Sequence, residues 1–182
     1  MIEGVVAPQS MPELGAALRS GPGQTVMAGG TAVMPVINGG QHATTRLISL
    51  RRMGLSGISA ASGMVSMGAA TPLSALAKHP DLTFLRGAID SIASPTIRNM
   101  ATVGGNLFVA APYGDFAVCL IALGATATVS GAGGERTVVP VETLSASTLH
   151  TAEIVSKISF TLPAPGTFHY HKAARRALGR PP

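Results

Sequence analysis

The stretch ASPTIRNMATVGGN, residues 93–106, decides how the rest of the chain is interpreted, because it ends on two adjacent glycines behind an apolar segment. A second glycine pair lies in VMAGGTAVMPV, residues 26–36, directly after a short apolar strand. Glycine lets a backbone approach a ligand closely, and successive N–H groups in such a turn can point toward one anion. Each pair lies near a threonine, Thr31 or Thr102, whose hydroxyl adds a donor. Together they predict two backbone cradles for one extended ligand with a diphosphate, although a single pair is explained equally well by a plain strand–turn–helix junction.

Two polar residues extend this predicted site along the chain. Asn106 would either fix the second glycine loop or contact the ligand, and Asp115 would either cap the helix that follows or accept a hydrogen bond from a ribose hydroxyl. The familiar dinucleotide fingerprint is absent, since the glycines of GPGQTV, residues 21–26, precede a strand instead of following one. A dinucleotide would therefore not be held in the Rossmann manner.

The composition limits the class of protein. A chain of 182 residues favours one domain built in two lobes. Charged residues make up only 12% of it, so much of its surface is apolar, which favours a subunit of a larger assembly. The net charge of +5 comes from scarce acids, and the absence of Trp removes a stacking platform for nucleic acid. We see neither a signal peptide nor a membrane span, and therefore expect a cytoplasmic protein without a membrane span that does not bind nucleic acid.

The side chains do not suggest chemistry of their own. The eight acids form no recognisable catalytic pair, and no Ser/His/Asp order is present. Cys119, the single cysteine, lies in the apolar run DFAVCLIAL and is expected to pack as a small hydrophobe. His169 and His171 share one face of an extended segment but lack a third ligand nearby, so we predict no metal site. We predict no catalytic residue, and any chemistry must come from a bound cofactor.

The roles of several basic side chains stay open. Arg98 would either orient the second glycine loop or form a surface salt bridge. The C-terminal set would either meet a phosphate or an acidic partner, or form a solvated basic tail; it comprises Lys172, Arg175, Arg176 and Arg180.

Strands and helices alternate along the chain with several antiparallel pairs, which indicates an α+β fold. Expected helices cover residues 10–20, with Ser10 and Glu13 at capping-box spacing, 71–77 with Thr71 as cap, 85–94 ended by Pro95, and 115–124. Expected strands and hairpins cover residues 2–8, 25–30, 43–50, 56–70 with Ser62-Gly63 at the turn, 125–141 and 152–163. A boundary between two lobes is expected near residues 50–56.

Beyond these patterns, AGGTAVMPVINGG (residues 28–40) and SPTIRNMATVGGNLFVAAPYGDFAVCLIALGA (94–125) resemble the two FAD-binding signatures of the flavoprotein, or medium, subunit of molybdenum hydroxylases. This is the carbon monoxide dehydrogenase and xanthine dehydrogenase family. MGAATPLSAL (67–76) and the segments FTLP and YHKAARR are also similar to it. The resemblance implies an FAD-binding PCMH-type fold like that of vanillyl-alcohol oxidase, with a small N-terminal α/β lobe and a larger lobe with a mainly antiparallel sheet. The expected divisions are residues 1–55, 56–170, and a tail or start of a further domain at 171–182.

The same resemblance implies a set of cofactor-binding residues. The backbone of two segments would wrap the diphosphate and neighbouring parts of FAD: Val26, Met27, Ala28, Gly29, Gly30, Thr31, Ala32 and Val33, then Thr102, Val103, Gly104, Gly105 and Asn106. Asp115 matches a position that contacts the adenosine end. Ile92, Val155, Tyr170 and Lys172 match further family positions.

The resemblance implies an oxidoreductase role in electron transfer. The substrate would be hydroxylated at a molybdenum cofactor in a large subunit, electrons would cross 2Fe-2S clusters in a small subunit, and FAD in this subunit would pass them to an acceptor. The protein is then expected to be a hetero-oligomer subunit. Two alternatives stay open: a scaffold or interaction subunit that keeps the fold without flavin, and a stand-alone flavin reductase.

Overall fold

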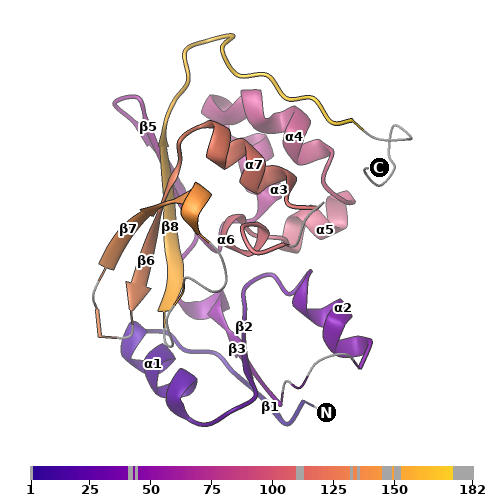
Figure 1. Cartoon of the computed structure of the whole chain (residues 1–182), viewed down its shortest axis with the longest axis vertical. Helices are drawn as coiled ribbons and strands as arrows, with labels where there is room; N and C mark the ends of the chain where they lie inside the picture. Colours follow the sequence, from indigo (N-terminus) through magenta and orange to yellow (C-terminus); the bar gives the residue numbers. More distant parts are fainter. Residues whose placement is uncertain are drawn as a thin grey trace.

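The chain folds into two sheets that lie end to end, the smaller one formed by its N-terminal part (Figure 1). The computed structural model describes residues 2–40, 43, 45–109, 113–131, 133–134, 136–144, 149 and 153–173. The expected tail beyond residue 173, with Arg175, Arg176 and Arg180, lies outside the described residues.

The small sheet is parallel, with strand order β1-β3-β2. Its strands are β1 (Gly4–Val6), β2 (Gln24–Met27) and β3 (Arg46–Ser49), and the crossovers carry α1 (Met11–Arg19) and α2 (Val33–Asn38). Parallel strands need such crossovers, and α1 packs its buried Leu14 against Ile48 of β3. A third partner of this cluster, Ile154, comes from the other sheet. The core of the small lobe is therefore completed by the large one.

The start of α1 has the predicted reciprocal cap. The Ser10 hydroxyl accepts a hydrogen bond from the N–H of Glu13 at 3.4 Å, and a Glu13 carboxylate oxygen accepts one from the N–H of Gln9 at 2.9 Å. Pro12 lies in the first turn, where its missing N–H costs nothing. The expected helix start is confirmed.

The large sheet is antiparallel throughout, with strand order β4-β5-β8-β6-β7. Its strands are β4 (Ile58–Ala61), β5 (Met64–Gly68), β6 (Thr126–Gly131), β7 (Arg136–Pro140) and β8 (Glu153–Thr161). The hairpin turn between β4 and β5 has Ser62 at φ 51° and Gly63 at φ 75°, the left-handed pair that a two-residue hairpin needs. The predicted α+β fold, with a small α/β lobe and an antiparallel sheet, is confirmed.

The helices of the large lobe gather on one side of its sheet (Figure 1). They are α3 (Leu73–Lys78), α4 (Arg86–Asp90), α5 (Pro95–Met100), α6 (Val103–Asn106) and α7 (Asp115–Ala122), with short 3-10 turns η1 (Leu50–Arg52), η2 (Pro80–Leu85) and η3 (Val141–Thr143). The main core fills the space between, with Leu73, Ile89 and Phe116 fully buried against Ile158 of β8. Among the described residues, no helix combines the length and apolar character needed to cross a bilayer.

Three expected helix ends are wrong. Thr71 does not cap α3, which starts after Pro72. The Thr71 hydroxyl instead accepts a hydrogen bond from the N–H of Gly57 and donates one to its carbonyl oxygen, both at 3.0 Å. Pro95 begins α5 instead of ending the preceding helix, because its fixed φ suits a first helical position and Ser94 caps the N–H of Ile97. The N-cap of α7 is Gly114, and Asp115 is its first helical residue.

We predict that Cys119 is chemically inert in the folded protein. Burial, assisted by the charge of Asp115, raises the pKa of the Cys119 thiol from 9.0 to about 11. A disulfide reagent at pH 8 should therefore react far more slowly with the native chain than with the urea-unfolded chain. The unfolded thiol ionises first as pH rises from about 9 toward 11, so thiol ionisation lowers stability across that window. Equal reaction rates in both states would contradict this packing.

Candidate functional site

The first glycine pair forms the tight turn between β2 and α2. Gly30 has φ +75°, which a side chain rarely tolerates. Gly29 is constrained differently: a Cβ on it would lie 1.8 Å from the carbonyl oxygen of Met100. Met100 ends α5, so the turn of the small lobe presses directly on the backbone of the large lobe. The missing side chain at Gly29 therefore allows the two lobes to meet.

The N–H groups of this turn have no partner among the residues that the structure describes. Within the described residues, no acceptor is bonded by the N–H groups of Gly29, Gly30, Thr31 and Ala32. Buried or half-buried amides of a folded protein normally have a partner. Successive unpaired amides after a glycine pair form a donor set suited to an anion.

The second glycine pair behaves differently, because its amides have acceptors within the protein. It lies inside α6, where Thr102 is the N-cap and its side chain accepts from the N–H of Gly105 at 3.1 Å. The N–H of Val103 donates to Thr71, that of Gly104 to Ala69, and that of Asn106 to Thr102, at 2.8–3.0 Å. All four amides of α6 therefore have an acceptor within the protein, and a ligand role for this segment stays a prediction.

Gly104 and Gly105 lack side chains for two separate reasons. A Cβ on Gly104 would lie 2.8 Å from Cβ of Ala69, so this glycine brings α6 against the end of β5. Gly105 is exposed and a Cβ there would meet only the Thr102 hydroxyl, at 2.9 Å. Its open side instead forms part of a cavity wall.

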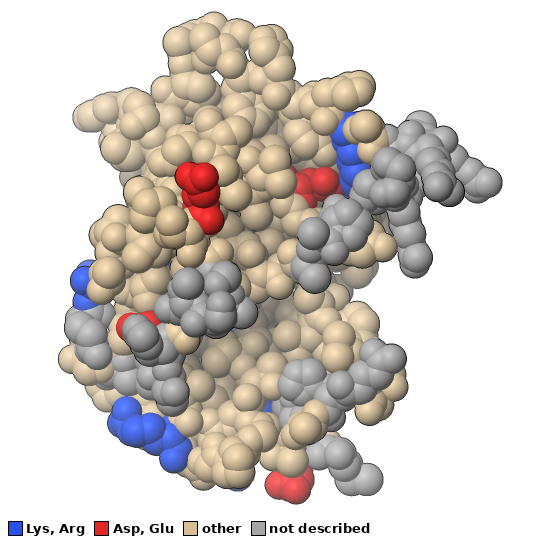
Figure 2. Space-filling view, in the orientation of Figure 1, with Lys and Arg blue, Asp and Glu red and all other residues tan. Residues whose placement is uncertain are grey.

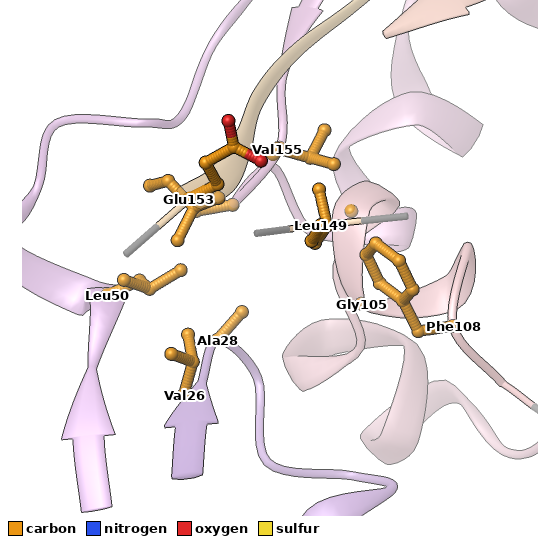
Figure 3. A pocket seen from close by; sticks show the side chains of 12 residues that line it. Val26, Ala28, Leu50, Gly105, Phe108, Leu149, Glu153 and Val155 are labelled. Carbon is orange, nitrogen blue, oxygen red and sulfur yellow. The ribbon is translucent and has the colours of Figure 1, made fainter. Parts of the chain in front are cut away.

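A mostly apolar cavity of about 270 Å³ lies between the lobes. Figure 3 shows Val26, Ala28 and Leu50 of the small lobe on one side of it, facing Glu153 and Val155 on the other. Phe108 and Gly105 close a third side, and the remaining lining residues are Ala69, Ala70, Gly104, Leu149 and Ile154. Of these residues Glu153 alone carries a charge. Such walls suit the flat apolar part of a ligand.

A second cavity, of about 200 Å³, shares the walls Ala28 and Ala70 with the first but is more polar. Its other lining residues are Gly29, Arg51, Ser56, Pro72, Asn99, Met100 and Thr102. The two cavities together could hold an elongated ligand that is apolar at one end and anionic at the other.

Seven of the eighteen predicted site residues line one or both of these cavities. Val26, Ala28, Gly104, Gly105 and Val155 line the apolar cavity, and Ala28, Gly29 and Thr102 line the polar one. Met27, Gly30, Thr31, Ala32 and Val33 continue the first turn without lining either cavity. Val103 and Ile92 belong to the buried core. Asn106 is also buried, and its Oδ1 has no donor among the described residues.

Three predicted residues lie outside both cavity linings and bond within the large lobe. The Lys172 ammonium contacts a carboxylate oxygen of Asp115 at 2.6 Å, and both side chains are less than a quarter exposed. The Tyr170 hydroxyl is 2.8 Å from that of Ser91. These contacts hold the C-terminal segment on α4 and α7. A ligand role for the three residues stays a prediction.

Arg98 does not reach the glycine loop. Its guanidinium donates to the backbone carbonyls of Asp90, Ile92 and Ala93 and lies 3.6 Å from the carboxylate of Asp90. It braces the turn between α4 and α5, where Ala93 has φ +46°. Of the two predicted roles, the salt bridge is the one found.

Several wall residues were missed by sequence reasoning, chiefly Leu50, Arg51, Phe108, Asn99 and Glu153. They come from η1, from the ends of α5 and α6, and from the first residue of β8. The two arginines of LRRMGLS were the only available signal, since a doubled cation is rare in so uncharged a chain.

The chain is similar to known proteins along most of its length. Residues 1–164 match the family described as "FAD binding domain in molybdopterin dehydrogenase". The carbon monoxide dehydrogenase medium chain of Hydrogenophaga pseudoflava is 30% identical over 183 residues, covering 95% of this chain and 63% of its own. The 6-hydroxypseudooxynicotine dehydrogenase complex subunit alpha of Paenarthrobacter nicotinovorans is 32% identical over 116 residues, 61% of this chain and 39% of its own.

Solved structures show the same fold. The carbon monoxide dehydrogenase from Hydrogenophaga pseudoflava that lacks the Mo-pyranopterin moiety matches with a TM-score of 0.83 at 28% identity, covering 91% of this chain and 61% of that one. A Cu,Mo-CO dehydrogenase matches with a TM-score of 0.81 at 26% identity, covering 90% and 61%. The chain thus spans less than two thirds of the length of these relatives.

We predict that Gly29→Ala destabilises the protein by about 2 kcal/mol, because the new methyl must push the lobes apart at Met100. Gly87→Ala is the matched control: Gly87 is in α4 and a Cβ there meets nothing within 4 Å. The control should be neutral or stabilise by about 0.5 kcal/mol. Urea unfolding of both variants measures the difference, and equal midpoints would refute the close approach.

We also predict a measurable coupling between Asp115 and Lys172. In a double-mutant cycle with Asp115→Asn and Lys172→Met, the coupling should be about 1 kcal/mol, discounted for the partial exposure of both groups. It should shrink as salt is added. Strictly additive effects on unfolding would show that the two side chains do not interact in solution.

Proposed function

Because this chain belongs to the family of FAD-binding domains of molybdopterin dehydrogenases, we propose that it is the FAD-binding, electron-transferring subunit of a molybdenum-containing hydroxylase or dehydrogenase. The observation that carries the proposal is the unpaired amide set of Gly29, Gly30, Thr31 and Ala32, next to two adjoining cavities between the lobes. Amide donors suit the anionic diphosphate of FAD, and apolar walls suit its ring systems. The residues present therefore fit this cofactor.

The chain's own residues would bind, orient and shield the cofactor. The amides of residues 29–32 would donate to phosphate oxygens, and the aliphatic walls Val26, Leu50 and Val155 with Phe108 would exclude water from the apolar cavity. The buried Asn106 Oδ1, without a donor in the described residues, would accept from a ligand N–H or O–H. Bound FAD would supply the reversible redox chemistry, for which the sequence predicted no catalytic side chain.

The two lobes form the halves of this proposed site. We assign residues 1–55 and 56–170 to them, since each range holds one sheet and most of one buried cluster. Ile154 is the exception, because it belongs to the large lobe but packs in the small lobe's cluster. Ile154 would keep the two lobes, whose residues form the cavity walls, in a fixed relative position while a ligand enters and leaves.

We propose that electrons reach this subunit from 2Fe-2S clusters of a small subunit, which takes them from a molybdenum cofactor in a large subunit, and that they leave to a separate acceptor. The support is that the relatives are named as one chain of larger complexes. Exposed apolar side chains also occur on the large lobe, at Val118 and Ile121 of α7 and at Val138 of β7. Such positions suit contact with partner chains.

The proposal is tested by titrating the purified chain with FAD and recording flavin absorbance and fluorescence. The parent chain should bind FAD and release it on heating. A chain that stays colourless and leaves added FAD unperturbed would contradict the proposal and favour a scaffold subunit with the same fold.

We predict that Gly105→Val weakens FAD binding at least tenfold, because the new side chain fills part of the apolar cavity. Gly87→Val is the matched control, an exposed helical glycine that lines neither cavity. Gly104 is unsuitable, since its Cβ would strike Ala69 and disturb folding. Thermal unfolding of both variants separates lost binding from lost fold. Parent-like FAD affinity in Gly105→Val would place the cofactor elsewhere.

A further inference from the structure

The polar cavity is lined by one cationic side chain, and neither the sequence motifs nor the fold explains its role. Arg51 is the middle residue of η1 and, of the described residues that line this cavity, the only charged one. It has no hydrogen bond or ion pair to any residue that the structure describes. Three other arginines have partners: Arg98 and Arg86 donate to backbone carbonyls, and Arg46 donates to Ser20.

The position of Arg51 is fixed by its neighbours in η1. Leu50, directly before it, is 6% exposed and packs in the small lobe's core. The N–H of Met53 closes the turn onto the carbonyl of Leu50 at 3.1 Å. The backbone of Arg51 is therefore held at the carboxyl end of β3, the central strand of the small sheet, while its side chain remains exposed. A guanidinium whose backbone is held in this way is partly preorganised to bind a ligand.

The opposite walls of the cavity supply further donors. Thr102 accepts from Gly105 but its hydroxyl hydrogen has no acceptor in the described part of the chain, and the side-chain amide of Asn99 has no partner there either. Ser56 differs, because its hydroxyl already donates to the carbonyl of Ala70 at 3.2 Å. No acid among the described residues lines the cavity. The site therefore combines one cation and several donors without a counter-charge.

We propose that Arg51 binds a phosphate of the cofactor's diphosphate in the polar cavity, across from Thr102 and Asn99. The inference rests on the proposed function, and it adds a side-chain cation from the small lobe to a site that the glycine turn supplies only with neutral amides. A guanidinium–phosphate contact is charge-assisted and, being partly exposed here, sensitive to salt. Arg51 is thereby a binding residue that makes affinity for the diphosphate depend on ionic strength.

Arg52 provides a matched control within the same turn. It is the next residue, it has the same charge and it is also exposed, but it lines neither cavity. Arg51→Gln and Arg52→Gln remove the same charge from the chain, so a general electrostatic effect would change both variants alike. Arg51→Lys keeps the charge and loses the planar fork, and should restore part of the affinity.

The experiment titrates the parent and the three variants with FAD and, separately, with inorganic pyrophosphate, at low and at moderate salt. Arg51→Gln should weaken FAD binding about tenfold and flatten its dependence on salt, while Arg52→Gln stays within twofold of the parent. Equal losses in both variants, or parent-like binding and salt dependence in Arg51→Gln, would overturn the inference.

The pyrophosphate titration separates the two proposals. A chain that ignores FAD but binds pyrophosphate through Arg51 would retain the anion site and contradict the proposed function. A chain that binds FAD equally well with and without Arg51 would retain the proposed function and remove this residue from it. A parent chain that binds neither probe would overturn both.

Discussion

The contact between Gly29 and the carbonyl of Met100 is the constraint on which the arrangement of the two lobes depends. A Cβ at Gly29 would lie 1.8 Å from that oxygen, so no other residue permits the same approach. The contact sets the turn after β2 directly against the end of α5, and the two cavities open on either side of their shared walls, Ala28 and Ala70. Ile154 reinforces it from β8 by completing the small lobe's core. The site is therefore a consequence of how closely two backbones can pack.

The two glycine pairs look equivalent in sequence but differ in whether their N–H groups have an acceptor within the described residues. The amides of Gly29 and Gly30 have no acceptor in the described residues, whereas those of Gly104 and Gly105 donate to Ala69 and Thr102. The difference arises from tertiary neighbours, since the end of β5 approaches α6 and uses its donors. One pair is left to present hydrogen-bond donors, and the other shapes a wall by lacking side chains. A motif that specifies small residues does not by itself specify which of these roles they take.

Local features were predictable because local interactions decide them. The capping pair of Ser10 and Glu13, the left-handed Ser62-Gly63 turn and the antiparallel hairpins follow from neighbours a few residues apart. The wall residues Arg51 and Phe108 were not predictable, since each lines a cavity whose other walls come from distant parts of the sequence and form only when the lobes pack. The same reason applies to the ion pair of Asp115, because its partner Lys172 comes from the far end of the chain.

The scarcity of charge gives each ion a large share of the local field. Figure 2 shows a face that is mostly uncharged and carries only a few acidic and basic side chains. Lys172 is neutralised by Asp115, and Arg98 is engaged by carbonyls and Asp90. Arg51, without such a partner in the described chain, stands at the polar cavity while the adjoining cavity is almost wholly apolar. Because the cation lies at the polar cavity and the adjoining cavity is apolar, an elongated ligand is favoured in one orientation, with its anionic part in the polar cavity. Main-chain donors alone would bind either end of a diphosphate equally, so the direction of binding depends on side chains that the glycine motifs do not contain.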